Sequence, residues 1–589
     1  MFRILLISLV FIAHPAFADT NLSDLECSLL IKKSADTDFS LKNLAGLYAN
    51  RKCKDFKFDF TTLSKLEKQI FKVKFDEIEA DLSRKEDSEE NVDNLKKLFK
   101  LEKNKLTQFE YFKKIRQKYR TSGQKKASFN LIQKYYADLH TEMIKSKKNK
   151  EDLFNVFNEV SQIYAKALWN NDNPKKALVE LDKAIKILDS KFPLYNLYLN
   201  KAKISEDQLL IDSALLNFDL SIKAFKNDSE KKISFDLAKV LWNKAWLMYQ
   251  NSKPEVALVA LKDIIDTATD PAEKTRAQFF AAKLYKKTNN ETESKKLLND
   301  NIQSDFFSFY AMASYKELNL KIPALTKSIN SEKIEIDKLS SFLEPAERQF
   351  FLDLLNYQEI EMAEKATLIL TKNNNDYVKL GLILAEKAQF FNTLFTGFAK
   401  SNITEKKELF SKYSKYLFPQ VHTEKVTEMS RLTEVSKPLI YSIMKQESGF
   451  NPSARSPSNA LGLMQVIPPL AKSLAKKYKI KDYKRNEDLY NPMVNIEMGV
   501  YELKEQLTKQ KGQLSFVASA YNAGPNALKR WVQREPITDM FEFIENIPYD
   551  ETRLYVKIIA RNMLFYQRLG QPDQEHDFPD DFIKIVPQT

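Results

Sequence analysis

Hydrophobic residues recur along most of the chain at spacings of three and four, with charged residues between them, and this periodicity predicts α-helices. Between residues 19 and 150 the pattern is clearest where large apolar residues stand among lysines: Leu95, Leu98, Phe99, Leu101 and Leu106. Glycine accounts for only 10 of the 589 residues, although hairpins, Rossmann turns and phosphate-binding loops all require it. The expected fold class is therefore all-α.

An imperfect repeat between about residues 151 and 318 predicts stacked helical hairpins. The first copy holds Leu168-Trp169, Asn173-Pro174, Ala177-Leu178, Leu181 and Ile185, the second holds Met248-Tyr249, Lys253-Pro254, Ala257-Leu258, Leu261 and Ile265, and a weaker middle copy holds Ala214-Leu215, Phe218 and Ile222. The alanines Ala177, Ala214 and Ala257 lie 37 and 43 residues apart, which is typical of helix-turn-helix units in a superhelix. The repeat loosely resembles tetratricopeptide-like repeats, and such an array serves either as a binding surface or as a scaffold.

The distribution of glycine indicates a domain boundary. Six of the ten glycines lie in the last 141 residues, so tight turns are concentrated in that part of the chain. The expected order is a signal peptide (1–18), an N-terminal helical region (19–150), a helical-repeat superhelix (151–322), a helical linker (323–429), a compact C-terminal domain (430–572) and a tail (573–589).

The first 18 residues predict export to the periplasm. Arg3 precedes an apolar run of signal-peptide length, and Ala16-Phe17-Ala18 has the small-residue pattern of a cleavage site, so the mature chain is expected to begin at Asp19. The run is too short for a transmembrane anchor, and no later stretch is long and apolar enough to span a bilayer. Leu25-Glu26 before Cys27 does not resemble the pattern that precedes a lipidated cysteine.

Cysteine and histidine are too scarce to suggest a metal centre. With four histidines and two cysteines, no zinc-ligand spacing can be assembled, and neither a metal nor a cofactor is expected. An exported chain with a single pair of cysteines is more often bridged than left with two free thiols, so Cys27 and Cys53 are expected to form a disulfide.

The positive charge of the chain is concentrated in one segment. Residues 96–150 contain 17 lysines and arginines against 4 aspartates and glutamates, and the resulting +13 equals the net charge of the whole chain. Two interpretations are equally open, a solvated helical face and a docking surface for a polyanion. Nucleic acid is not an expected partner, because the chain is predicted to be exported and has no aromatic-plus-basic recognition motif.

One helix of the C-terminal domain predicts a catalytic carboxyl group. Apolar residues follow helical periodicity from 439 to 444, and Glu447, four positions after Ile443, lies on the same face. Gly449 can end the helix in a left-handed conformation, with Phe450 making the accompanying apolar contact. A carboxyl group on an apolar face is desolvated, which raises its pKa toward the value that a general acid needs near neutral pH.

Four motifs follow one another between residues 446 and 556. They are Gln446-Glu447-Ser448-Gly449-Phe450-Asn451-Pro452 followed by Ser456, then Gly462-Leu463-Met464-Gln465, then Ala520-Tyr521-Asn522-Ala523-Gly524-Pro525, and finally Ile547-Pro548-Tyr549-Asp550-Glu551-Thr552-Arg553 with Tyr555-Val556. In this order they resemble the motifs of the soluble lytic murein transglycosylases. The resemblance implies a goose-type-lysozyme-like α-domain that cleaves peptidoglycan glycan strands, joined in larger members through a helical linker to an α-superhelix.

The resemblance implies a role for each matching residue. Glu447 matches the catalytic acid and base, and the substrate-binding positions are matched by Ser456, Met464, Gln465, Tyr521, Asn522, Tyr549 and Glu551. Other interpretations stay open for Ser456 as a turn residue, for Met464 as core, and for Glu551 as a first-turn glutamate that favours the helix dipole.

Two positions depart from the family's pattern. Asn459 stands where members commonly have glycine, and because asparagine readily adopts a positive φ, the loop is expected to be kept. Pro468-Pro469 lacks the usual threonine before Ala471, which puts the local helix cap in question.

The chemistry expected of Glu447 needs one carboxyl group only. Ordinary glycoside hydrolysis uses two, but no acidic residue follows Glu447 before Asp482, although a distant one could fold into reach. The expected reaction is a lyase reaction between N-acetylmuramic acid and N-acetylglucosamine that leaves 1,6-anhydro-N-acetylmuramic acid, in cell-wall remodelling or turnover.

Two other functions remain open, a water-using muramidase and an inactive wall-binding helical scaffold. The expected partner is the peptidoglycan glycan strand, with electrostatic contact between residues 96–150 and anionic murein.

Overall fold

The computed structural model describes residues 21–71, 92–145, 151–189, 192–228, 236–251, 254–325, 329, 331–534 and 536–586. This part of the chain is helical and contains no β-strand, only isolated bridges such as the one between Ile322 and His576, so the all-α prediction is confirmed. Within the same residues, no helix has the length and hydrophobicity to cross a bilayer, and no three potential metal ligands lie together. The predicted signal peptide 1–18 lies outside the described residues.

Packing divides the chain into two compact units. One contains residues 1–77 together with 315–589, and the other contains residues 78–314. The unit boundaries reflect contacts in space, whereas the boundaries expected from the sequence divide the chain into consecutive segments. Those expected boundaries remain predictions, and each unit is described by itself.

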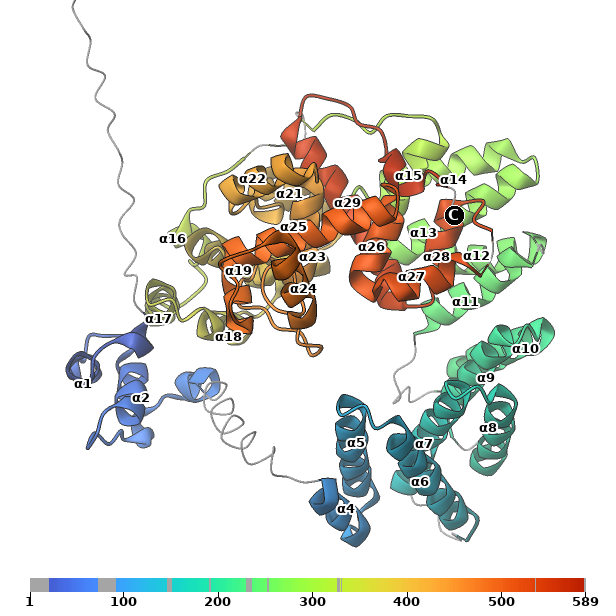
Figure 1. Cartoon of the computed structure of the whole chain (residues 1–589), viewed down its shortest axis with the longest axis horizontal. Coiled ribbons are helices and arrows are strands. Elements are labelled where there is room, and N and C mark those ends of the chain that lie inside the picture. The colour runs from blue at the N-terminus through green and yellow to red at the C-terminus, as the bar shows by residue number, and fades with distance from the viewer. Residues whose placement is uncertain are drawn as a thin grey trace, which may run out of the picture. The chain divides into compact units, whose positions relative to one another are not determined.

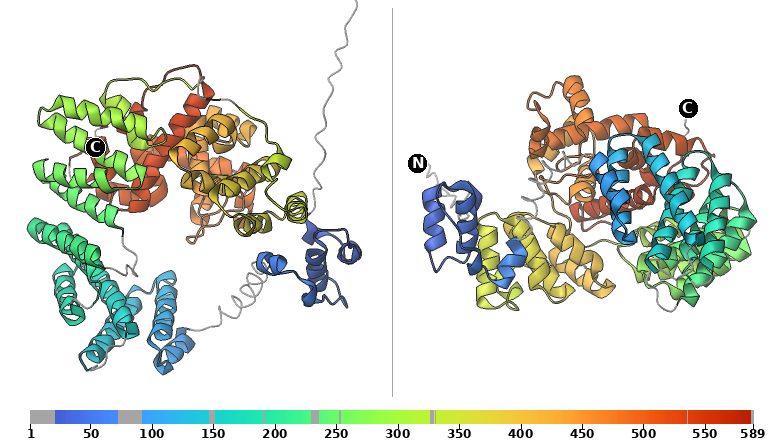
Figure 2. Two further views of the ribbon diagram at one scale, coloured as in Figure 1. Left: turned by 180° about the vertical axis from the view of Figure 1, so that it is seen from behind. Right: turned by 90° about the horizontal axis from the view of Figure 1, so that it is seen from below.

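The unit of residues 78–314 is a series of helices that pair with their neighbours in the chain. Its helices are α4 (Val92–Leu101), α5 (Lys105–Thr121), α6 (Lys125–Lys145), α7 (Glu151–Trp169), α8 (Pro174–Leu188), α9 (Tyr195–Asp207), α10 (Ile211–Asn227), α11 (Leu237–Gln250), α12 (Pro254–Thr267), α13 (Pro271–Lys287) and α14 (Glu291–Ser304), with α15 (Phe309–Glu317) at its end. Helix α7 packs against α8, α9 against α10, α11 against α12, and α13 against α14 (Figures 1 and 2). These pairs confirm the helical hairpins that the repeat predicts.

The alanines of the repeat are buried, and its prolines begin helices. Ala177, Ala214 and Ala257 are completely buried, which is consistent with close approach of the helix backbones. Pro174 is at the start of α8 and Pro254 at the start of α12, where a helix does not need the N–H that proline lacks. The prolines thus mark the starts of α8 and α12, and the small alanine side chains lie in the packed interior.

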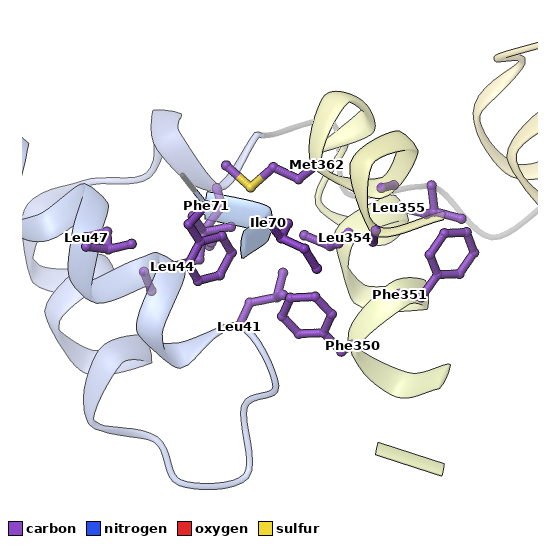
Figure 3. Packing of buried hydrophobic residues seen from close by; sticks show 14 of the residues in the cluster. Leu41, Leu44, Leu47, Ile70, Phe71, Phe350, Phe351, Leu354, Leu355 and Met362 are labelled. Carbon is purple, nitrogen blue, oxygen red and sulfur yellow. The ribbon is translucent and has the colours of Figure 1, made fainter. Parts of the chain in front are cut away.

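In the other unit, the N-terminal helices pack against helices that lie far along the chain. Helices α1 (Cys27–Ala35) and α2 (Lys42–Lys52) share one core with α17 (Pro345–Asn356), α18 (Ile360–Leu370) and α19 (Asn374–Ala388). Figure 3 shows Ile70 and Phe71 between the leucines of α2 and the side chains of α17. A disulfide joins Cys27 and Cys53, whose Cα atoms are 5.5 Å apart, so α1 and α2 are also linked covalently.

The same unit holds the helices that carry the sequence motifs. After η1 (Leu22–Asp24), η2 (Phe60–Thr62), α16 (Ile336–Leu339), α20 (Asn392–Lys400) and α21 (Ile403–Leu417) come α22 (Thr423–Thr433), α23 (Lys437–Ser448), α24 (Pro468–Tyr478), η4 (Asn486–Tyr490), α25 (Pro492–Lys509), α26 (Leu514–Ala523), α27 (Pro525–Val532), α28 (Met540–Glu545), α29 (Asp550–Gly570) and α30 (Asp580–Ile583). Helix α29 packs against both α23 and α26 (Figure 1). Three of the four motifs therefore lie on helices that touch one another.

Candidate active site

Helix α23 carries the predicted acid and ends as its sequence predicts. Pro438 lies in its first turn, and the apolar residues from 439 to 444 are buried. Gly449 ends the helix with φ +59° and donates its N–H to the Lys445 carbonyl oxygen. A Cβ at this position would lie 1.6 Å from Asn392 Oδ1, so another residue would have to displace the Asn392 side chain as well as adopt a positive φ. Phe450 is buried and its ring makes a T-shaped contact with Phe391, at the start of α20, whereas the expected contact with the last turn of α23 stays a prediction.

The Glu447 side chain is half-buried at the C-terminal end of α23. Its Oε1 accepts a hydrogen bond of 2.6 Å from the Tyr555 hydroxyl on α29. Burial raises the pKa of Glu447 from 4.5 to about 7, the Tyr555 hydrogen bond lowers it, and the charge of Glu551 adds to the rise. The carboxyl group is therefore protonated in a large fraction of molecules near neutral pH, and it is still open to solvent.

Two tyrosines border this carboxyl group. The Tyr521 hydroxyl on α26 donates to the Met464 carbonyl oxygen at 2.8 Å. Burial, followed by the charge of Glu447, raises the pKa of Tyr521 and of Tyr555 well above the usual range. Both phenols therefore stay protonated and act as hydrogen-bond donors, so they stabilise the carboxylate and the neighbouring loop without competing for its proton.

The loop that carries Met464 is fixed by a buried asparagine on α25. The Asn495 side chain accepts a hydrogen bond of 2.7 Å from the Met464 N–H and donates to the carbonyl oxygens of Leu461 and Leu489. A Cβ on Gly462, whose φ is +76°, would lie 2.2 Å from the Leu489 carbonyl oxygen. Met464 itself is completely buried, so its side chain belongs to the core, as the second interpretation of this residue expected.

The loop also holds two of the other predicted residues. Gln465 has φ +51° and donates from Nε2 to the carbonyl oxygens of Gly462 and Ala454, so its amide nitrogen is occupied within the loop. The Ser456 hydroxyl accepts a hydrogen bond of 3.0 Å from the Ala460 N–H, which closes its own turn. Both side chains therefore hold the backbone of the loop that carries Met464.

The two departures from the family's pattern have local solutions. Asn459 adopts φ +63° as predicted, and its Oδ1 accepts from Arg455 Nε at 3.2 Å. Helix α24 begins with Pro468 after Ile467, which makes no side-chain capping hydrogen bond. Prolines in the first turn take the place of the usual cap, because they leave fewer unsatisfied N–H groups there.

Hydrogen-bonded polar side chains from the last two motifs lie together at the start of α29. Thr552 donates from Oγ1 to Asn522 Oδ1 at 2.5 Å, and Asn522 Nδ2 lies 3.5 Å from Glu551 Oε1. Glu551 is exposed in the first turn of α29, where its negative charge is favourable for the helix dipole. The same charge raises the pKa of Glu447. Tyr549 is 50% exposed and lies edge-on to Trp531.

Several residues with a clear part in this geometry were not among the predicted site residues. Tyr555 belongs to the last motif, and Asn495 is a polar residue on an apolar helix face, which is the signal that could have identified it. Lys445 donates from its buried Nζ to the Leu417 carbonyl oxygen at 2.8 Å, and Asn392 donates to the Ser448 carbonyl oxygen at 3.2 Å. These two bonds attach the end of α23 to the preceding helices α20 and α21.

Comparison with protein families identifies a domain over this site. Residues 425–544 match the family model of the Transglycosylase SLT domain, which includes Glu447, Met464 and Tyr521 and ends before Tyr549. The soluble lytic murein transglycosylase of Salmonella typhimurium is 26% identical over 310 residues, which are 51% of this chain and 45% of that protein. A putative soluble lytic murein transglycosylase of Haemophilus influenzae is 32% identical over 170 residues, 29% of this chain and 28% of that protein. The chain thus spans less than half the length of these curated relatives.

Two solved structures show the same fold. A 70-kDa soluble lytic transglycosylase in complex with bulgecin A has a TM-score of 0.55 at 17% identity and covers 74% of this chain and 66% of its own. An inactive mutant of lytic transglycosylase Slt from Pseudomonas aeruginosa has a TM-score of 0.53 at 17% identity, over 94% of this chain and 98% of its own. In the second comparison the likeness thus extends over nearly the whole chain.

Proposed function

We propose that the chain is a peptidoglycan lytic transglycosylase that cleaves the β-1,4 bond between N-acetylmuramic acid and N-acetylglucosamine, because it contains a Transglycosylase SLT domain and is similar to soluble lytic murein transglycosylases. The observation that carries the proposal is the carboxyl group of Glu447. It is half-buried, its pKa is raised to about 7, and one of its oxygens is held by Tyr555. These are the properties that a group needs in order to give up a proton and take one back at neutral pH.

The reaction begins with protonation of the glycosidic oxygen by Glu447. Tyr555 occupies Oε1, so Oε2 carries the proton that is transferred. The bond between C1 of the muramic residue and the glycosidic oxygen then breaks, and the 2-N-acetyl group of the substrate stabilises the cationic carbon. The Glu447 carboxylate accepts the proton of the muramic C6 hydroxyl as that oxygen attacks C1. The product is a 1,6-anhydro sugar, Glu447 is protonated again, and no water is consumed.

The remaining groups of the site bind and orient the glycan in this proposal. Asn522 and Glu551 lie together at the exposed start of α29, where they can hydrogen-bond sugar hydroxyl and acetamido groups. The exposed ring of Tyr549 offers an apolar face on which a sugar ring can lie. Met464, Gln465 and Ser456 act through the shape of the loop whose backbone forms the wall beside Glu447. No second carboxylate is required, because the 2-N-acetyl group and the C6 hydroxyl of the substrate take its place; Glu551 affects Glu447 only through its charge.

The proposal is tested with purified murein and mass spectrometry of the released muropeptides. The wild-type chain is expected to release products lighter by one water than those of a lysozyme, and Glu447→Gln, which keeps the shape of the side chain but not the proton, is expected to release none. Reducing-end products from the wild type would assign the chain to the water-using muramidases. Absence of product from a folded wild type would favour the wall-binding scaffold, and full activity of a folded Glu447→Gln protein would refute the role of this residue.

Export to the periplasm, with cleavage after Ala18, is part of the same proposal. The paired cysteines Cys27 and Cys53 support it, because a disulfide persists in an oxidising compartment. Mass spectrometry of the mature N-terminus tests the cleavage site. We also propose that the basic segment 96–150 adds electrostatic attraction to anionic murein, and binding to isolated sacculi should then weaken as the ionic strength rises.

A further inference from the structure

Helices α4, α5 and α6 enclose a pocket of about 570 Å³ in the unit of residues 78–314. Its wall is partly aromatic: the rings of Phe99 and Tyr135 meet edge to face at 4.9 Å, and Tyr119 is buried beside them. Its volume lies within the range of about 300 to 1,000 Å³ that is usual for small-ligand pockets. The pocket is therefore a formed cavity within the basic segment, in addition to the charged surface that the sequence predicts.

Lysines line this pocket, and they are not equally neutralised. Lys105 pairs with Glu142 at 2.6 Å, and Lys96 pairs with Asp93 at 3.2 Å. Lys100 and Lys134 are exposed at the pocket and have no ion-pair partner among the residues that the structure describes.

Asp138 also lines the pocket, so the surface is not uniformly positive. The pocket thus presents two available ammonium groups, the carboxylate of Asp138, the ion pair of Lys105 with Glu142, and an aromatic wall at the same place.

We infer that this pocket binds the peptide stem of peptidoglycan, with its carboxylates at Lys100 and Lys134. The inference rests on the proposed function, which makes peptidoglycan the substrate. A stem peptide carries several carboxylates, an amino group and short aliphatic parts, which complement the two lysines, Asp138 and the rings of Phe99 and Tyr135 respectively. Where a stem is attached, the lactyl carboxyl group of muramic acid is an amide, so the carboxylates that match these lysines belong to the stem. The chain then has a second substrate contact that recognises peptide rather than sugar.

The experiment uses the full chain and the free tetrapeptide stem released from purified murein, with binding measured by calorimetry. Exposed charge pairs contribute modestly, so Lys100→Gln combined with Lys134→Gln is expected to weaken binding about fivefold, and added salt to weaken it further. The matched control is Lys125→Gln combined with Lys126→Gln. It removes the same charge from exposed positions of α6 that do not line the pocket, and it is expected to leave binding within about twofold of the wild type.

The outcomes separate this inference from the proposed function. Equal binding by the pocket variant and the control, or equal binding of a stem whose carboxylates are amidated, would overturn it. Binding of anionic phospholipid vesicles that depends on the same two lysines, without binding of the stem, would also overturn it. Anhydro products from peptide-free glycan strands are measured in parallel and are expected from both variants. If those products are absent from the wild type while stem binding depends on Lys100 and Lys134, the proposed function fails and the pocket assignment stands.

Discussion

The hydrogen bond from Tyr555 determines the pH range in which Glu447 can act as an acid, and Tyr555→Phe tests this. The bond is 2.6 Å long and favours the carboxylate, whereas burial raises the pKa to about 7. A hydrogen bond to a charged group contributes about 1.5–3 kcal/mol, and one pH unit of pKa corresponds to about 1.4 kcal/mol, so the loss of this hydroxyl raises the pKa by about one to two pH units. The protonated acid starts the reaction, so activity falls as pH rises through this pKa.

The assay is the pH dependence of kcat/KM for muropeptide release, which reports the pKa of the free enzyme. The wild type is expected to lose activity above about pH 7, and Tyr555→Phe to retain it to a pH about one to two units higher. The control is Tyr566→Phe in the same helix, because Tyr566 is also buried but donates to the Pro419 carbonyl oxygen. Its pH profile should match the wild type. If the profile of Tyr555→Phe also matches the wild type, the hydrogen bond does not govern the acid.

Three further predictions concern stability and covalent structure. Glu447→Gln is expected to stabilise the fold above pH 7 by about 3 kcal/mol, because the folded pKa of about 7 lies above the ordinary 4.5 and the wild type loses stability as pH rises across that interval. Urea unfolding at acid and alkaline pH measures this difference, and equal curves at alkaline pH would contradict it. Thiol labelling of unreduced, denatured protein should find no free cysteine, and two labelled thiols would refute the bridge between Cys27 and Cys53, which is expected to contribute about 3.5 kcal/mol. Asn495→Ala is expected to destabilise the fold by about 2–3 kcal/mol in thermal unfolding, because it removes the side-chain partner of three buried backbone groups. A loss of stability below about 0.5 kcal/mol would show that these groups find other hydrogen-bond partners.

Features that depend on neighbours in the chain were predictable from the sequence. The periodicity before Glu447 and the glycine after it are enough to place a carboxyl group at the end of a helix whose apolar face is buried. The helical hairpins follow in the same way, because Ala177 and Pro174 act within one repeat. Asn459 is a further case, since its positive φ is a property of the residue type.

Features that depend on distant parts of the chain were not predictable in this way. Tyr555 reaches Glu447 across 108 residues, and Asn495 reaches Met464 across 31. No periodicity relates such pairs, because their distance is decided by how α29 and α25 pack. The same reason explains why Gln465, assigned from the resemblance to substrate binding, donates its amide hydrogens to the loop backbone in the structure. The motif identifies the place of a side chain, and only the fold decides its hydrogen-bond partners.

The core shared by the N-terminal helices and α17 to α19 has a consequence for the order of folding. Lys33 donates to the Tyr357 hydroxyl across 324 residues, and the whole unit of residues 78–314 is encoded between the two halves of this core. At a synthesis rate of about 5–20 residues per second, roughly 16–65 s pass between the synthesis of an N-terminal residue such as Lys33 and that of its partner 324 residues later. The intervening unit is continuous and can begin to pack its own helices during this time, whereas the leucines of α2 can be buried in this core only after α17 to α19 have been synthesised. A chain that stops before residue 343 would therefore expose the leucines of α2 permanently, so burial of this core requires synthesis through α17 to α19.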